Sequence, residues 1–262
     1  MRRLVIALVV LVVLLVAADF GAAALAESAV SRQMRQQIGL ADDPSVRING
    51  FPFLTQALSG RYSSIDVDAQ RITVGQFRQA ELTAHLQDVT APLSMLLGSG
   101  PKTVRVAQAE GAVKIGANDL QRLVPGVTKI RIESVDKKAL AQLVQDGGDA
   151  SLADIDPDKA ARIVGTVTLL GNPIEIAVIA VLDLNSGDAQ IAPRDVRLSD
   201  GTPLPLPQVA QRVILAKFNQ PLDAGTLPLK VTPTTFQAQD GYLVVSGTAS
   251  GLIIGGGSAA AG

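Results

Sequence analysis

The alternation of apolar and polar side chains predicts β-strands along most of the chain. The two-residue period is clearest over residues 80–87, where Ala, Leu, Ala and Leu alternate with Glu, Thr, His and Gln. This pattern is typical of an antiparallel strand that has one buried and one solvated face. Shorter or less regular runs of the same kind predict further strands at residues 46–48, 65–74, 104–106, 113–115, 130–135, 163–170, 174–184, 189–198, 229–236 and 242–254.

A few short helices are expected between these strands. The apolar segment 51–58 predicts one short helix that runs to Gly60. A second is predicted at residues 120–124, capped by Asn118 or Asp119, and a third at residues 137–144. The one convincing amphipathic helix covers residues 206–218. Strands and helices do not alternate regularly, which favours an antiparallel α+β fold over a doubly wound sheet.

Three positions carry specific structural expectations. Glu110–Gly111 predicts the turn of a hairpin between residues 104–106 and 113–115. The Gly- and Asp-rich segment 146–158 is the best candidate for an internal boundary, and Asp156–Pro157 inside it is typical of a helix start. The strand 174–184 is apolar on both faces. Both faces therefore need cover, which the core would supply on one side and a helix, a partner or a bound apolar ligand on the other.

The N-terminal residues 1–26 form a targeting or anchoring segment. Two arginines precede an unbroken apolar run from Leu4 to Ala18, and Asp19 interrupts it before a further apolar stretch to Ala26. Ala24–Leu25–Ala26 fits a signal-peptide cleavage site, so removal is one interpretation. About 20 apolar residues also span a bilayer, so a retained transmembrane anchor is the other. Either way, the body of the protein is expected outside the cytoplasmic membrane, at the cell envelope or periplasm.

These observations predict an order of segments along the chain. Residues 27–43 are expected to form a helical spacer that ends at Gly39, and residues 44–254 a single α+β domain. Residues 255–262, rich in Gly and Ala, are expected to be a disordered tail.

The composition excludes several classes of function. With 23 basic and 24 acidic residues, the chain lacks the basic excess of a nucleic-acid-binding protein. Without cysteine it forms no disulfide and no thiolate metal site. Residues 154–158 begin like a calcium loop, but Lys159 and Gly165 occupy the positions that need Gly and Glu. We therefore predict neither a metal nor another cofactor.

His85, the only histidine, is the sole candidate for the base of a Ser-His-Asp hydrolase. It falls on the polar face of the strand 80–87, where a solvent-facing residue is the plain interpretation. The sequence has no G-x-S-x-G nucleophile motif. Nothing in these residues requires an enzyme.

The surplus of Val, Leu, Ile and Ala suits the binding of acyl chains, because such walls are adaptable and gain free energy by burial alone. The candidate lipid-binding side chains are bulky apolar residues of the segment 51–58, of the strand 174–184 and of the helix 206–218. They are Phe51, Phe53, Leu54, Leu58, Ile176, Val178, Val213 and Ile214.

Several strings carry a resemblance to a known family. They are ADFGAA at residues 18–23, VRINGFPFLTQ at 46–56, Gly60-x-Tyr62, GTVTLLGNP at 165–173 and LPL at 227–229. In these residues the chain resembles the LmeA-like phospholipid-binding family of actinobacterial envelope proteins. The resemblance extends over most of the chain beyond residue 44, and GFPFLTQ is its most specific string.

The resemblance implies a fold similar to tubular lipid-binding (BPI-like) domains, in which a curved antiparallel sheet and helices enclose an apolar groove. It also implies phospholipid binding or transfer at the membrane surface, a link to lipoglycan (lipomannan) maintenance, and phospholipase A activity as an option. An envelope phospholipase A-type esterase and an accessory protein of an envelope glycosyltransferase remain the alternative functions.

Overall fold

The computed structural model describes residues 1–74, 77–92, 94, 103–169, 171–183, 189–222 and 232–254. The predicted tail 255–262 and the string at 227–229 lie outside the described residues. The helices are α1 (Arg2–Ile38), α2 (Phe53–Ser59), α4 (Ala117–Leu123), α5 (Lys137–Gln145) and α6 (Gln208–Phe218), with the 3₁₀ turns η1 (Ala150–Asp154) and η2 (Pro157–Lys159). The strands are β1 (Ser45–Asn49), β2 (Arg61–Val74), β3 (Phe77–Thr90), β4 (Val104–Gly116), β5 (Val127–Glu133), β6 (Ala160–Leu169), β7 (Asn172–Asp183), β8 (Ala189–Leu198), β9 (Gln220–Leu222), β10 (Thr232–Gln239) and β11 (Tyr242–Ile254).

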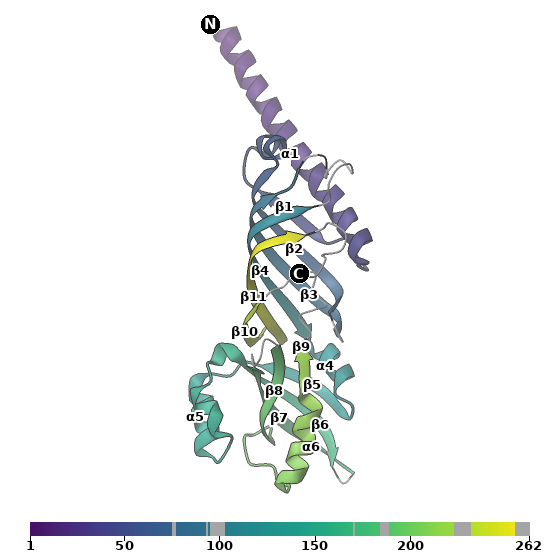
Figure 1. The fold of residues 1–262 in the computed structure, drawn as a ribbon, viewed down its shortest axis with the longest axis vertical. Helices are drawn as coiled ribbons and strands as arrows, with labels where there is room; N and C mark the ends of the chain where they lie inside the picture. Colours follow the sequence, from purple (N-terminus) through teal and green to yellow (C-terminus); the bar gives the residue numbers. More distant parts are fainter. Residues whose placement is uncertain are drawn as a thin grey trace, which may run out of the picture. The chain divides into compact units, whose positions relative to one another are not determined.

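These strands form two antiparallel sheets (Figure 1). The six-stranded sheet has the order β1-β2-β3-β4-β11-β10, and the five-stranded sheet has the order β5-β6-β7-β8-β9. The sheets are curved and do not close into a barrel. The prediction of an antiparallel α+β fold is confirmed.

The chain divides into two compact units. Unit 1 contains residues 1–71, 82–111 and 248 onward, and unit 2 contains residues 72–81 and 112–247. The segment 146–158 lies inside unit 2, so the internal boundary expected there is wrong. The helix start expected in this segment is confirmed, because the Asp156 side chain accepts a hydrogen bond from the Asp158 amide and Pro157 opens η2.

Helix α1 runs without interruption from the predicted anchor into the predicted spacer. It ends at Gly39, whose φ of 71° lies in the left-handed region, and the amides of Gly39 and Leu40 both bond the Arg35 carbonyl. A glycine reaches this conformation without a steric penalty, which explains the stop. The side chains of residues 4–15 are largely exposed, whereas Ala22, Ala23 and Ala26 pack against the core of unit 1.

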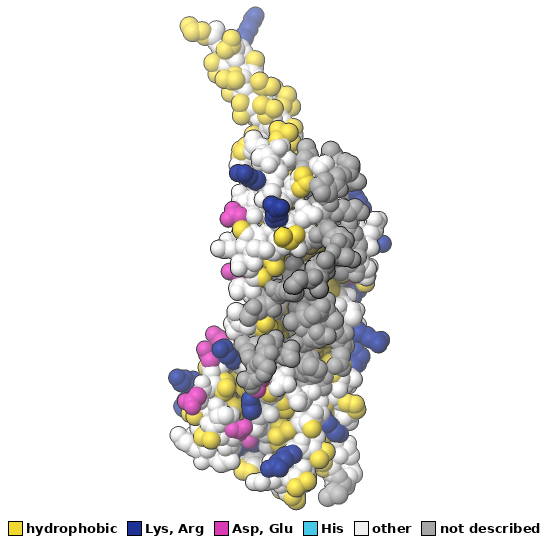
Figure 2. All heavy atoms as spheres, in the orientation of Figure 1, with side chains coloured by type: hydrophobic (Ala, Val, Ile, Leu, Met, Phe, Trp, Pro, Cys, Tyr) yellow, Lys and Arg dark blue, Asp and Glu magenta, His cyan; other side chains and the backbone are white. Residues whose placement is uncertain are grey.

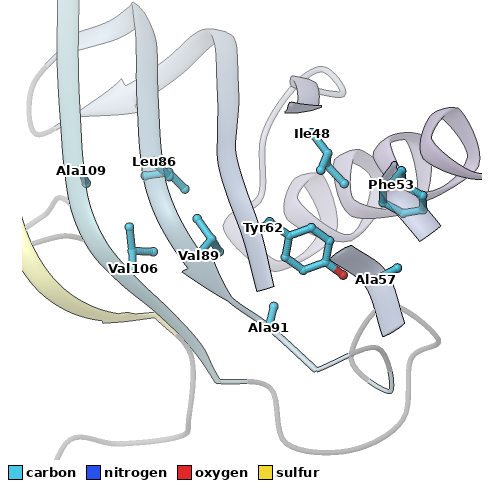
Figure 3. Close-up of a cluster of buried hydrophobic side chains, with 9 residues drawn as sticks. All are labelled: Ile48, Phe53, Ala57, Tyr62, Leu86, Val89, Ala91, Val106 and Ala109. Carbon is cyan, nitrogen blue, oxygen red and sulfur yellow. The ribbon is translucent and has the colours of Figure 1, made fainter. Parts of the chain in front are cut away.

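The core of unit 1 lies between its sheet strands, α1 and α2 (Figure 3). Phe53 and Ala57 of α2 contribute to it, together with Tyr62 at the start of β2. The rest of the buried cluster comes from inward-facing residues of the strands and the segment after β3: Ile48, Leu86, Val89, Ala91, Val106 and Ala109.

In unit 2 the double-sided burial expected for the strand 174–184 is confirmed. Every residue of β7 from 176 to 182 is buried. Ile179 and Val181 share a cluster with Leu140 of α5 and Leu152 of η1, so these two short elements cover one face of β7. Burial on both faces explains why β7 has an almost continuous apolar sequence.

Two local expectations are wrong. Residues 104–116 form one strand, not a hairpin, because β4 pairs with β3 on one side and β11 on the other, and this pairing overrides the turn preference of Glu110–Gly111. The start of α4 has no side-chain cap, since the Asp119 carboxylate instead accepts the amides of Arg78 and Gln79.

The amphipathic helix predicted at residues 206–218 is confirmed as α6, and its apolar stripe is only partly buried. Phe218 is buried, but Val209 and Val213 are 73% and 59% exposed.

Candidate functional site at the junction of helices α1 and α2

The GFPFLTQ string forms a tight connection between β1 and β2. Gly50 has a φ of 105°, and a β-carbon there would lie 2.8 Å from Nε2 of Gln56. The Gln56 amide donates to the Asn49 carbonyl (3.3 Å) and accepts from the Ser63 amide (3.0 Å). Gln56 therefore ties α2 to both strands. Any other residue at position 50 would be strained by the positive φ and would displace the Gln56 amide.

Asp19 caps the N-terminus of α2 from another part of the chain. Its two carboxylate oxygens each accept one backbone amide, from Phe53 and from Leu54, both at 2.8 Å. The local N-cap residue, Pro52, makes no side-chain cap bond. Asp19 is only 5% exposed. A carboxylate at this position satisfies two otherwise unpaired donors and interacts favourably with the helix dipole.

Further contacts fasten α1 to the rest of unit 1. The Glu27 carboxylate accepts the Ile48 amide at 2.8 Å, and the Ser31 hydroxyl donates to the Pro44 carbonyl. Arg35 pairs with Asp43 at 3.2 Å. Positions 27, 31 and 35 follow one another at four-residue spacing, so each lies next to the following one on the helix surface. The sequence gives no direct sign of these contacts, because each partner lies on a different element.

The predicted lipid-binding residues separate into exposed and buried groups. Phe53 is 5% exposed and packs near Tyr62 with ring centroids 6.4 Å apart, so it belongs to the core (Figure 3). Phe51, Leu54 and Leu58 are 62%, 40% and 79% exposed. We call these three residues together with Phe20, which is 64% exposed, the α2 apolar surface. The Phe20 and Phe51 rings are stacked at 6.0 Å.

The other four predicted residues lie in unit 2. Ile176 and Val178 are completely buried within β7, whereas Val213 is exposed and Ile214 half-buried on α6. Burial within the packed sheet gives Ile176 and Val178 a role in the core.

Tyr62 places a polar atom inside the core of unit 1. The side chain is 2% exposed, and its hydroxyl has no hydrogen-bond partner among the described residues. Burial raises the pKa of this phenol. A buried hydroxyl without a partner costs about 1–3 kcal/mol, so a ligand oxygen that reached it would be stabilised.

His85 contacts the Asp66 carboxylate through Nδ1. Asp66 also accepts a 2.8 Å hydrogen bond from the Asn49 amide, and these two hydrogen bonds lower the pKa of Asp66. The His85 and Asp66 side chains are 42% and 39% exposed. A carboxylate that orients an imidazole supplies two of the three groups of a hydrolytic triad. No described contact brings a serine hydroxyl to His85.

An open hollow of about 640 Å³ lies in unit 2 beside α5. Its walls include Leu143 and Ile179, with Arg162 and Arg197 among the polar residues. Arg197 is bound by the Asp195 carboxylate and the Leu143 carbonyl, and Arg162 by Glu133 and the Ser199 carbonyl. Both guanidinium groups are therefore already neutralised or hydrogen-bonded. None of the predicted lipid-binding residues lines this hollow.

Among the described residues, no group of three or more His, Asp or Glu side chains could hold a metal ion. In the same part of the chain, α1 alone is long and apolar enough to cross a membrane. Figure 2 shows hydrophobic side chains covering its projecting end.

Comparison with known proteins decides the family. A family model described as LmeA-like phospholipid-binding matches residues 17–248. The chain belongs to the LmeA-like phospholipid-binding family. The matched region of this family member begins inside α1, two residues before Asp19, and contains every contact of the α1–α2 junction described above. No curated protein and no solved structure matches the chain.

Proposed function

We propose that this protein is an extracytoplasmic phospholipid-binding or lipid-transfer protein of the cell envelope, and that it supports lipoglycan maintenance there. Membership of a phospholipid-binding family carries the proposal. The apolar N-terminal helix agrees with a position outside the cytoplasmic membrane.

We place the acyl chains against the apolar corner formed by α2 and the start of β2. Phe51, Leu54 and Leu58 offer exposed apolar side chains on this corner. The Tyr62 hydroxyl, in the buried cluster that includes Phe53 and Ala57 of α2, lacks a partner among the described residues, and a lipid ester oxygen would supply one. Apolar contact provides the affinity, at about 25 cal/mol per Å² buried, and the hydroxyl provides orientation.

The test is native mass spectrometry of the full chain after gentle extraction, with lipids identified from the released mass. Bound phospholipid is the expected result. A chain that is lipid-free and also takes up no phospholipid from vesicles would refute the function.

Tyr62→Phe tests the position separately from the function. Loss of an unpaired hydroxyl leaves stability unchanged or slightly higher. Phospholipid occupancy should fall, because the lipid loses its hydrogen bond. Unchanged occupancy would exclude the Tyr62 site and leave lipid binding intact. Thr55→Val serves as the matched control, since the Thr55 hydroxyl is exposed and donates only to the Pro52 carbonyl.

The paired His85 and Asp66 favour a second candidate function, a phospholipase A-type esterase. In that case His85 would act as the general base for a water molecule that attacks the lipid ester carbonyl, and the proton it takes would pass to the leaving lysophospholipid alcohol as the fatty acid is released. Fatty-acid release from phospholipid vesicles that is lost in His85→Ala, with the fold intact, would place hydrolysis above transfer. Release that survives this substitution and renewed purification would support hydrolysis without His85.

A further inference from the structure

We propose that the α2 apolar surface is seated in the outer boundary of the membrane that α1 crosses, and that α1 stays part of the mature protein. The partner of this surface is thus a phospholipid bilayer. The inference rests on the extracytoplasmic placement proposed above, but it does not require lipid transfer.

The length of the apolar run sets the depth of α1. The uninterrupted stretch from Leu4 to Ala18 has 15 residues. At about 1.5 Å per residue it spans roughly 22 Å, whereas the hydrocarbon core of a bilayer is about 30 Å thick. The shortfall of roughly 8 Å corresponds to about five further residues, which brings the bilayer boundary to Ala23. Tilting the helix increases the shortfall.

Asp19 and Phe20 therefore lie at hydrocarbon depth near the outer boundary. An unpaired charge at the bilayer centre costs about 2.5–3.5 kcal/mol, and less toward the edge. Here the Asp19 carboxylate already accepts two backbone amides and is almost fully enclosed by protein. Its oxygens need no water, so Asp19 is compatible with this depth.

The same two hydrogen bonds bring α2 to that depth. Because the amides of Phe53 and Leu54 bind Asp19, the first turn of α2 lies level with residue 19 of α1. Phe51 stacks on Phe20 at this level. Leu54 and Leu58 are four residues apart and share one face of α2. The stacked rings of Phe20 and Phe51 thus join the α2 apolar surface to the exposed apolar side of α1.

Folding within unit 1 does not account for these exposed side chains. In the GFPFLTQ string, Gly50 makes room for Gln56, and Phe53 fills the core. Phe51 and Leu54 remain substantially exposed, although their neighbours serve the fold. Side chains of this kind that gather beside a membrane-spanning helix fit the apolar side of an interfacial helix.

Retention of α1 follows from the contacts beyond Ala18. Cleavage after Ala26 would remove Asp19, the cap of α2, and Phe20, the stacking partner of Phe51. It would also remove Ala22 and Ala23 from the packing against the unit 1 core. The segment is a structural part of unit 1 as well as an anchor.

The absence of cysteine makes a depth measurement direct. Single Leu54→Cys and Leu58→Cys variants of the full chain carry a nitroxide label after reconstitution into vesicles of phosphatidylethanolamine and phosphatidylglycerol. Leu11→Cys is the bilayer reference. Gln70→Cys is the aqueous reference, since this exposed residue lies nine positions along β2 from Arg61, roughly 30 Å at 3.3 Å per residue.

Electron paramagnetic resonance then compares accessibility to oxygen and to a water-soluble nickel chelate. The labels at 54 and 58 should favour oxygen, as at 11, whereas the label at 70 should favour nickel. Labels at 54 and 58 that behave like the label at 70 would overturn the proposal. Dipolar broadening with protection from both reagents would also overturn it, because a second copy would then cover the surface.

The intact mass of the purified, natural chain tests retention independently. A mass that includes residues 19–26 is expected, and a mature chain that begins at Glu27 would refute the retained anchor. Lipid occupancy measured on the same preparation separates the two proposals. If phospholipid is bound but the labels at 54 and 58 are exposed to water, only the proposed seating of the α2 apolar surface in the membrane is rejected. If the labels lie in the bilayer but no phospholipid is bound, only the proposed phospholipid-binding function is rejected.

Discussion

Replacing Asp19 with Asn removes the charge that holds α2 against α1. The carboxylate accepts two amide hydrogen bonds at 2.8 Å in a site that is 5% exposed. Hydrogen bonds to a charged group contribute about 1.5–3 kcal/mol each. Asn keeps one carbonyl acceptor but turns an NH₂ group toward the second amide, so one bond is lost and one donor is left unpaired. We expect the free energy of unfolding to fall by about 2–4 kcal/mol.

Urea unfolding of the full chain in detergent, followed by far-ultraviolet circular dichroism, measures this loss. With a slope of about 2 kcal/mol per molar urea, the midpoint should decrease by about 1–2 M. Hydrogen exchange should accelerate at the amides of Phe53 and Leu54, because they lose their acceptor. The matched control is Asp68→Asn, the same change at an exposed position of β2, with an expected effect within about 0.5 kcal/mol.

Equal midpoints for Asp19→Asn and Asp68→Asn would refute the reasoning. The capping of α2 by Asp19 would then contribute nothing measurable, and the depth assigned to α2 would lose its structural basis. A reduced midpoint without faster exchange at Phe53 and Leu54 would place the damage elsewhere in α1 and would equally contradict the capping role.

Three further predictions concern the core, the sheet packing and the pH dependence. Phe53→Ala should lower the free energy of unfolding by about 3–5 kcal/mol in the same urea assay, because a buried ring leaves a cavity; a loss below about 1 kcal/mol would contradict its core position. Gly165→Ala should lower the free energy of unfolding by about 1–3 kcal/mol, since the added β-carbon would lie 2.5 Å from Cγ1 of Val127. An unchanged urea midpoint would mean that β5 and β6 can move apart without loss of stability. The pKa of Asp66 is lowered in the folded state, so its contribution to stability is present above the ordinary carboxyl pKa and is lost as the pH falls through the lowered value. Asp66→Asn should therefore reduce the loss of unfolding free energy between neutral and acidic pH. The reduction should be less than about 1 kcal/mol, because the side chains of Asp66 and His85 are both more than a third exposed. The same loss in Asp66→Asn as in the unchanged chain would refute the pairing with His85.

Periodicity along the chain was sufficient to predict most strands of the fold. The alternation at 80–87 and the doubly apolar run at 174–184 correspond to β3 and β7, because side-chain period and burial are local consequences of strand geometry. The prediction was wrong at residues 104–116, where the turn preference of Glu110–Gly111 suggested a hairpin in place of a single strand. Pairing of β4 with strands distant in sequence outweighs that local preference.

The candidate site was predictable in part. The sequence indicated that GFPFLTQ is a special segment, but not which of its apolar side chains face the core. Phe53 and Ala57 point inward, while Leu54 and Leu58 point outward, because α2 is a single short helix whose orientation is set by Asp19 and Gln56. The local sequence pattern does not indicate that Asp19 binds the start of α2 or that Gln56 binds β2.

The sequence by itself determined the α+β class, the apolar N-terminal segment and the family resemblance, since these depend on side-chain periodicity, composition and short strings. Only the tertiary structure decided that Asp19, an apparent interruption of an apolar run, is the buried cap of a helix 34 residues away. The physical reason is that a carboxylate pairs with any unsatisfied amides that the fold brings to it. Such a hydrogen bond can join residues that are far apart in the sequence, so the local sequence pattern does not predict it.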